Sequence, residues 1–166
     1  TISLHESGRY LFPGSGDVKE TGRDEGKGFS VNVPLDQHTD DSTYLWAFRA
    51  VVPPLVRAFC PDVLVAQLGI DTHYLDPLTD LCLTSYGFVD VIKELVGLCP
   101  KLLALGGGGY DVGAVARGWA LAYGVMSGNH LPNEIPKAYR QKFGLKKLHD
   151  DAGPVVGQKD LARARK

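Results

Sequence analysis

The sequence predicts an α/β protein built on a parallel β-sheet. Two continuous apolar runs of strand length, residues 63–68 (VLVAQL) and 102–105 (LLAL), indicate strands that are covered on both faces. Segments in which apolar residues recur with helical spacing alternate with the predicted strands. This alternating order is typical of parallel strands joined by helices.

The first part of the chain supplies two strands and one helix. Residues 1–5 and 29–34 are β-prone, and the glycine-rich polar stretch between positions 12 and 28 predicts a loop. Apolar residues between positions 45 and 59 recur every three or four residues, which predicts an amphipathic helix. Three residues just before it are candidate N-caps: Asp40, Asp41 and Ser42.

The second part of the chain continues the alternation. An irregular polar stretch over residues 69–83 and a helix over residues 86–98 separate the two apolar strands. After the second strand, a third helix is predicted to bury one apolar stripe, formed by Val112, Val115, Trp119, Tyr123 and Met126. Beyond position 127 the pattern is lost, and the basic run Arg163–Lys166 is expected to be a solvated end.

Composition excludes several classes of function. The 166 residues suffice for one domain, and 44% hydrophobic with 22% charged residues is typical of a soluble globular protein. A net charge of −1 gives no reason to expect nucleic-acid or anionic-membrane partners, and no apolar run is long enough to span a membrane. Three separated cysteines among apolar neighbours, Cys60, Cys82 and Cys99, predict buried reduced thiols and a cytoplasmic location.

Polar groups follow both apolar strands at the points where the strands end. Asp71 comes shortly after the first strand, and Tyr110 follows the glycine run at 106–109. Because parallel strands end at the same edge of a sheet, we expect both side chains at one edge. A phenol can donate a hydrogen bond to a developing oxyanion, and a carboxylate can bind a metal. The pair predicts metal-assisted hydrolysis of a carbonyl compound.

The glycine run also suggests a phosphate-binding loop, but its spacing is wrong. A dinucleotide-binding G-x-G-x-x-G pattern starting at Gly106 or Gly107 would need glycine at Asp111 or Val112. No Gly-Lys-Ser/Thr follows either. Nucleotide binding is therefore disfavoured.

Several motifs together resemble the histone deacetylase superfamily, and most closely its bacterial acetoin-utilisation members. They are SLH, FPGSGD, NVPL, QLGIDTHYLDPL and LALGGGGYDVGAVARGWA, with a looser match through LPNEIP. The resemblance implies the C-terminal part of the arginase/deacetylase-type parallel sheet with flanking helices. It also implies that residues 1–130 form the C-terminal half of a catalytic domain and residues 131–166 an extension and tail.

The resemblance assigns roles to individual residues. Asp71 stands at the position of a zinc ligand (iron is possible), and Tyr110 at that of the tyrosine that donates to the substrate carbonyl and the oxyanion. Ser3, Leu4 and Phe29 match ligands of monovalent cation sites, for which potassium is expected. Substrate contacts are implied at the acyl-lysine channel and its lip: Phe12, Leu78, Gly107, Gly108 and Gly109.

Two further residues near Asp71 have open roles. Asp71-Thr72-His73 is itself an Asp-x-His, so His73 is either a local metal ligand or, more plausibly, a contact at the rim of the site. Asp76 is a second rim candidate, although an Asp before Pro more often accepts hydrogen bonds that order a loop.

The chain departs from the family pattern in one serious respect. The family's histidine pair and its Asp-x-His zinc ligands lie upstream of the match to Thr1. A catalytic zinc usually has three protein ligands. We therefore expect the chain alone to bind no metal and to be inactive, unless a longer protein or a second chain supplies the missing groups.

Three functions stay open at this stage. The first is part of a zinc-dependent deacetylase acting on acetyl-lysine in proteins or on a small acetylated amine. The second is a non-catalytic fragment or assembly module that associates with itself through an exposed sheet edge. The third is an acetylpolyamine amidohydrolase, for which acidic rim residues such as Asp76 and Asp80 would suit a cationic amine.

Overall fold

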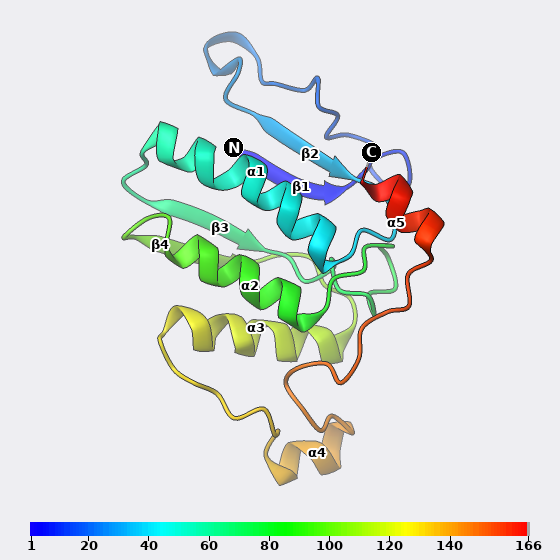
Figure 1. Cartoon of the computed structure of the whole chain (residues 1–166). Helices are drawn as coiled ribbons and strands as arrows, with labels where there is room; N and C mark the ends of the chain where they lie inside the picture. The colour runs from blue at the N-terminus through cyan, green and yellow to red at the C-terminus, as the bar shows by residue number, and fades with distance from the viewer. Residues whose placement is uncertain (166) are drawn as a thin grey trace.

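The computed structural model describes residues 1–165 and has the alternating order expected of an α/β protein (Figure 1). A short 3-10 turn, Asp24–Gly26, interrupts the long loop after the first strand. In chain order the strands and helices are β1 (Ile2–Glu6), β2 (Val31–Leu35), α1 (Asp41–Phe59), β3 (Leu64–Leu68), α2 (Ser85–Val96), β4 (Leu102–Gly106), α3 (Val112–Met126), α4 (Lys137–Phe143) and α5 (Gln158–Ala164).

The strands pair in parallel, as predicted. β1 pairs with β2 with Leu4 opposite Val33, and β3 pairs with β4 with Leu68 opposite Gly106. Over residues 1–165 the two pairs form two separate two-stranded sheets rather than one continuous sheet. The α/β class is therefore confirmed, while the expectation of a single sheet is not met within this chain.

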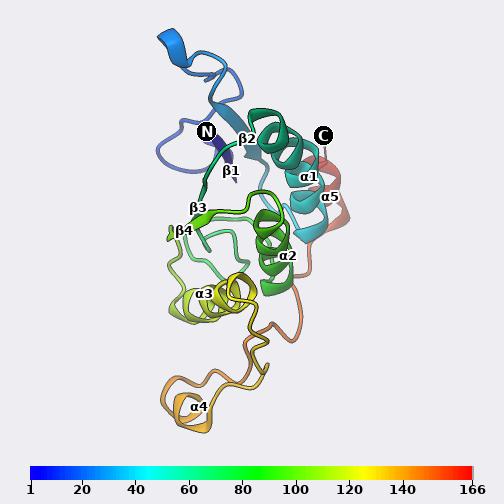
Figure 2. The same ribbon diagram turned by 90° about the vertical axis from the view of Figure 1, so that its left-hand side faces the viewer.

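The helices cover only one face of β3 and β4. Figure 2 shows α1, α2 and α3 on the same side of these strands, and the buried core lies between, with Phe48, Val52, Ile70, Phe88 and Ile92 among its residues. Along both strands the side chains alternate between buried or half-buried and exposed, so Val65, Leu103 and Leu105 face outward. The prediction that both faces of the strands are covered is wrong for this chain.

The third helix buries a different face from the predicted one. Val112 and Tyr123 of the predicted stripe are exposed, whereas the buried positions are mostly small residues: Ala114, Gly118, Leu121 and Ala122, with Gly124 and the polar Arg117. A Cβ at Gly118 would lie only 2.7 Å from Cδ1 of Ile70. The small residues let α3 approach the loop after β3 closely, and this contact determines which face is buried.

The segment beyond residue 130 returns to the body of the protein. α4 projects away from the core, and α5 lies beside the start of α1 (Figures 1 and 2). Arg163 forms an ion pair with Asp36 at 2.9 Å, and Nη2 of Arg165 donates to Oγ of Ser42 at 3.2 Å. The prediction of a freely solvated basic end is thus wrong for these two arginines, and Lys166 lies outside the described residues.

Two expectations drawn from composition can also be compared with the structure. Cys99 is buried, but Cys60 is exposed at the C-cap of α1, so the prediction that all three thiols are buried is wrong. Within residues 1–165, no helix combines the length and apolar character needed to cross a membrane.

Candidate active site

The predicted site is built where β3 and β4 end side by side. The backbone N–H of Ile70 donates to the carbonyl oxygen of Gly108 at 2.8 Å, so the two loops that leave the strands continue in contact. A Cβ added to Gly108 would lie 2.1 Å from Oδ2 of Asp71. The structure therefore brings Asp71 against the glycine run, as expected of neighbouring parallel strand ends.

The close contact between the two loops explains the run of glycines. A Cβ at Gly107 would lie 2.7 Å from the backbone nitrogen of Gly69. Gly109 has φ = +144°, and its Cβ would lie 2.5 Å from Cγ2 of Ile70. Side chains cannot occupy these spaces. Glycine is required at Gly107 because the two loops pack closely, and at Gly109 because the loops pack closely and φ is positive.

The backbone of Tyr110 is held by Asp76. The Tyr110 N–H donates to Oδ2 of Asp76 at 2.8 Å, and Oδ1 of Asp76 accepts from the Leu78 N–H at 2.9 Å. Asp76 is buried with both oxygens engaged, so it orders the loop and is not the rim group that was considered. Tyr110 as a residue remains 55% exposed.

Asp71 lies in an environment that disfavours its negative charge. Burial raises the pKa of the Asp71 carboxyl above its ordinary value, and the nearby charge of Asp76 raises it further. The Thr79 hydroxyl donates to the Asp71 carbonyl oxygen and orders its backbone. A cation bound at Asp71 would offset both unfavourable effects.

His73 does not lie at the rim. Its side chain is only 2% exposed, its Nε2 lies 3.0 Å from Oδ2 of Asp150, and its Nδ1 accepts from the Leu75 N–H at 3.2 Å. The chain turns after Asp71, with the His73 N–H donating to the Ile70 carbonyl, so positions 71 and 73 are not on one side of an extended segment. Both ring nitrogens have partners inside the protein, which contradicts a ligand or rim role for His73.

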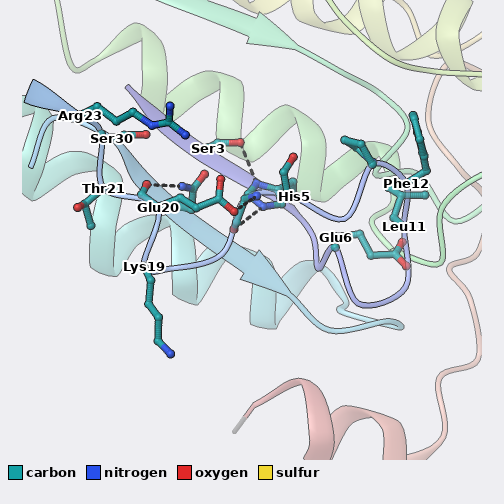
Figure 3. A pocket seen from close by; sticks show the side chains of 16 residues that line it. Ser3, His5, Glu6, Leu11, Phe12, Lys19, Glu20, Thr21, Arg23 and Ser30 are labelled. Carbon is teal, nitrogen blue, oxygen red and sulfur yellow. Dashed lines mark hydrogen bonds between the residues drawn. The ribbon is translucent and has the colours of Figure 1, made fainter. Parts of the chain in front are cut away.

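The other predicted site residues, apart from Leu78, come from the first strand pair and the loop that joins its strands. Ser3 and Leu4 are in β1, and Phe29 precedes β2. Phe12, 92% exposed, lines a cavity of about 670 Å³ between β1 and the long loop, together with Ser3 and His5 (Figure 3). Neither Asp71 nor Tyr110 is among the residues that line this cavity.

Leu78 is the remaining predicted channel residue. It follows Asp76 in the loop after β3, its N–H donates to Oδ1 of Asp76, and its side chain is exposed. Leu78 is therefore close in the chain to Asp71 and shares the Asp76 carboxylate with the Tyr110 N–H, whereas Phe12 lines the cavity beside β1. The roles of both residues in substrate binding stay predictions.

The side chains described here do not form a complete zinc site. Among residues 1–165, no three His, Cys, Asp or Glu side chains are grouped so as to hold a metal ion. Asp71 could supply one carboxylate ligand, whereas a catalytic zinc usually has three protein ligands. The donor set of residues 1–165 therefore does not fit zinc by itself.

Sequence analysis missed a buried polar cluster beside the site, centred on Asp150. Oδ1 of Asp150 accepts from Nη1 of Arg117 at 2.7 Å, and Oδ2 accepts from the backbone N–H of Ser85 at 2.7 Å, besides its contact with His73. Burial alone would raise the pKa of Asp150, but the hydrogen bonds from His73, Ser85 and Arg117 outweigh it and hold that pKa well below its usual range. The segment around Asp150 has no periodic pattern, so no local signal could have revealed these contacts.

The comparison with family models identifies the family. A model described as "Histone deacetylase domain" matches residues 1–126, which include both strand pairs, Asp71 and Tyr110. The chain belongs to the histone deacetylase family. Asp71 and Tyr110, which the sequence predicts at neighbouring strand ends, both lie within the region that the family model matches.

Its relatives include bacterial acetoin utilization proteins. The chain is 40% identical over 153 residues to the acetoin utilization protein AcuC of Bacillus subtilis (strain 168), a match covering 86% of the chain and 38% of that protein. AcuC of Staphylococcus xylosus is 36% identical over 148 residues, with 85% and 38% covered. The chain therefore spans 38% of the length of these curated relatives.

Solved structures confirm the predicted fold. A crystal structure described as an HDAC homolog complexed with SAHA superposes with a TM-score of 0.85 at 27% identity, covering 99% of this chain and 50% of that one. The structure of an HDAC homolog from Aquifex aeolicus superposes with a TM-score of 0.81 at 26% identity and the same coverage. The chain has the arginase/deacetylase-type α/β fold over half the length of those chains.

Proposed function

We propose that this chain contributes Tyr110 and Asp71 to the active site of a deacetylase, which hydrolyses the amide bond of an acetylated lysine or of a related acetylated amine. The observation that carries the proposal is the contact between the loops after β3 and β4, in which Ile70 donates to Gly108. This contact places a carboxylate and a phenol-bearing loop at one edge of the fold. Membership of the histone deacetylase family supports the same reaction.

In this proposal Tyr110 acts on the substrate carbonyl. Its neutral hydroxyl donates a hydrogen bond to the carbonyl oxygen and stabilises the negative charge that develops there during amide hydrolysis. The backbone hydrogen bond to Asp76 orients the loop that carries Tyr110. Gly107, Gly108 and Gly109, with Leu78 and Phe12, are proposed to line the path of the acylated side chain.

Zinc dependence is a further part of the proposal. Asp71 is proposed as one ligand of zinc, or of iron in its place, with the remaining ligands outside the residues described here. Ser3, Leu4 and Phe29 are proposed contacts for potassium. The side chains of residues 1–165 do not by themselves complete a metal site. A cytoplasmic location is part of the same proposal.

The third alternative, an acetylpolyamine amidohydrolase, has less support from the structure. It relied on Asp76 and Asp80 as acidic contacts for a cationic amine. Asp76 is buried and uses both carboxylate oxygens inside the protein, so only Asp80 is exposed. The loop therefore offers one acidic group rather than two.

A second candidate function is a non-catalytic assembly module. It is favoured by the outward-facing apolar residues of β3 and β4 and by the incomplete metal-ligand set within residues 1–165. Metal analysis separates the two functions. In the catalytically complete protein, stoichiometric zinc together with release of acetate from an acetyl-lysine peptide supports the deacetylase; absence of both supports the module.

Replacement of Tyr110 by phenylalanine tests the catalytic role directly. In the catalytically complete protein, Tyr110→Phe is expected to lower kcat by about 10²–10³, because one oxyanion donor is removed. Tyr123→Phe is the matched control, since Tyr123 is an exposed phenol on α3 away from the strand ends. Turnover by Tyr110→Phe equal to that of the unaltered protein would refute the assignment.

A further inference from the structure

We propose that Asp150 is a positioning residue that holds Asp71 and Tyr110 in place from the C-terminal segment. This inference rests on the proposed function, because holding Asp71 and Tyr110 in place affects catalysis only if these two residues act in the reaction. It goes beyond that function because Asp150 lies outside the region matched by the family model, which ends at residue 126. A continuous set of hydrogen bonds leads from Asp150 to the two loops of the site.

Asp150 joins three parts of the fold at one buried point. Its carboxylate accepts from Arg117 of α3, from the first backbone N–H of α2 at Ser85, and from His73 in the loop after β3. Its own backbone N–H donates to Oγ of Ser85 at 2.9 Å. All four residues are buried, so water does not replace these contacts without local opening of the structure.

His73 transmits this anchor to the loop that carries Asp71. Its Nδ1 accepts from the Leu75 N–H, its N–H donates to the Ile70 carbonyl, and its carbonyl accepts from the Asp76 N–H at 2.8 Å. Because Nδ1 is an acceptor, Nε2 carries the ring proton and donates to Asp150. The turn around Asp71 is therefore tied to His73 through the His73 backbone at Ile70 and Asp76 and through its ring at Leu75, and Asp150 orients that ring.

Asp76 extends the connection to Tyr110. Its Oδ2 accepts from the Tyr110 N–H, and Tyr110 directly precedes Asp111, the N-cap of α3. Arg117, on the second turn of α3, donates through Nη1 to both Asp150 and the Leu148 carbonyl, and through Nε to the Gly113 carbonyl. The C-terminal segment thus fixes the start of α3 as well as the loop after β3, and Tyr110 lies between them.

Local opening of these contacts can be measured without any assay of activity. In the unaltered chain, amide hydrogen exchange should report one common opening for the N–H groups of Leu75, Ser85 and Tyr110, because each donates within the same connected set. Independent opening of Tyr110 would overturn the proposal. This measurement needs no variant, so it stands even if a replacement at position 150 fails to fold.

The variant test replaces Asp150 by asparagine. Asp150→Asn is expected to speed amide exchange at Tyr110 by about tenfold or more and to remove the downfield ring-proton signal of His73 Nε2. Arg163→Ala is the matched control, since it releases the same C-terminal segment from Asp36 at a point away from the strand ends. A folded Asp150→Asn protein with unchanged exchange at Tyr110 would overturn the role.

Kinetic measurements distinguish a failure of this inference from a failure of the proposed function. In the catalytically complete protein, Asp150→Asn should lower kcat about 10- to 100-fold with KM nearly unchanged, as misplacement of reacting groups does. Coupled exchange at Tyr110 in a protein without deacetylase activity would support the positioning and refute the proposed function. Deacetylase activity with uncoupled exchange would refute the positioning alone.

Discussion

At the scale of single residues, the glycine run shows how a packing requirement shapes the site. The loop after β3 lies so close to the run that Cβ atoms at Gly107, Gly108 and Gly109 would overlap Gly69, Asp71 and Ile70 respectively. In the structure the glycines approach the neighbouring loop, which in turn fixes the position of Asp71 beside the run.

Gly109 should tolerate no side chain. Gly109→Ala is expected to lower the free energy of unfolding by about 1–3 kcal/mol, because it combines φ = +144° with overlap of the buried Ile70 side chain and the half-buried Val115 side chain. Gly26→Ala is the control, since a Cβ there meets no atom within 4 Å. Denaturant unfolding of both variants measures the difference, and equal stability of the two would contradict this account.

At the scale of elements, side-chain caps define where the helices begin. Asp40 caps α1, Thr84 caps α2 and Asp111 caps α3, each accepting from a backbone N–H of the first turn. Asp41 accepts from the Thr84 N–H and hydroxyl, which ties the starts of α1 and α2 together. Of the three cap candidates predicted for α1, the structure selects Asp40.

The cap at Asp40 should depend on pH. Burial alone would raise the pKa of Asp40, but hydrogen bonds from Thr43 and Ser42 outweigh it and lower that pKa below its ordinary value. A lowered folded-state pKa means that the contribution to stability is complete above about pH 4 and is lost as the pH falls through the folded-state value.

Asp40→Ala is therefore expected to cost about 1 kcal/mol of unfolding free energy at pH 7, and less as the pH falls below about 4. Urea unfolding at a series of pH values measures this difference. Asp90→Ala is the control, because Asp90 is an exposed residue of α2 paired only with Lys93 three residues along the same helix. A cost that stays constant down to pH 3 would contradict the role of the ionised carboxylate.

At the scale of the whole molecule, helices cover one face of the strand pair β3–β4 and leave the other face open. The helices pack on one face of β3 and β4, and apolar side chains of both strands face outward on the other. Contiguous apolar surface of this kind commonly marks an interaction site. The C-terminal segment, by contrast, is held to the body by Asp150 and by the ion pair between Arg163 and Asp36.

We expect the 166-residue chain to associate with itself through this outward face. Leu103→Glu should shift the association to higher protein concentration without lowering stability, because Leu103 is 52% exposed in β4. Tyr139→Glu, at an exposed position of α4, should leave association unchanged. Sedimentation velocity over a range of concentrations measures both. A chain that stays monomeric throughout would contradict the expectation.

The sequence by itself determined the strands, the first three helices and the meeting of Asp71 with the glycine run. Each of these follows from interactions within a few residues or from the rule that parallel strands end together. Only the tertiary structure decided which face of α3 is buried, which face of β3 and β4 is covered, and that His73 turns inward to Asp150. These two residues are 77 positions apart, and contacts over such distances depend on how elements pack, which leaves no periodic trace in the chain.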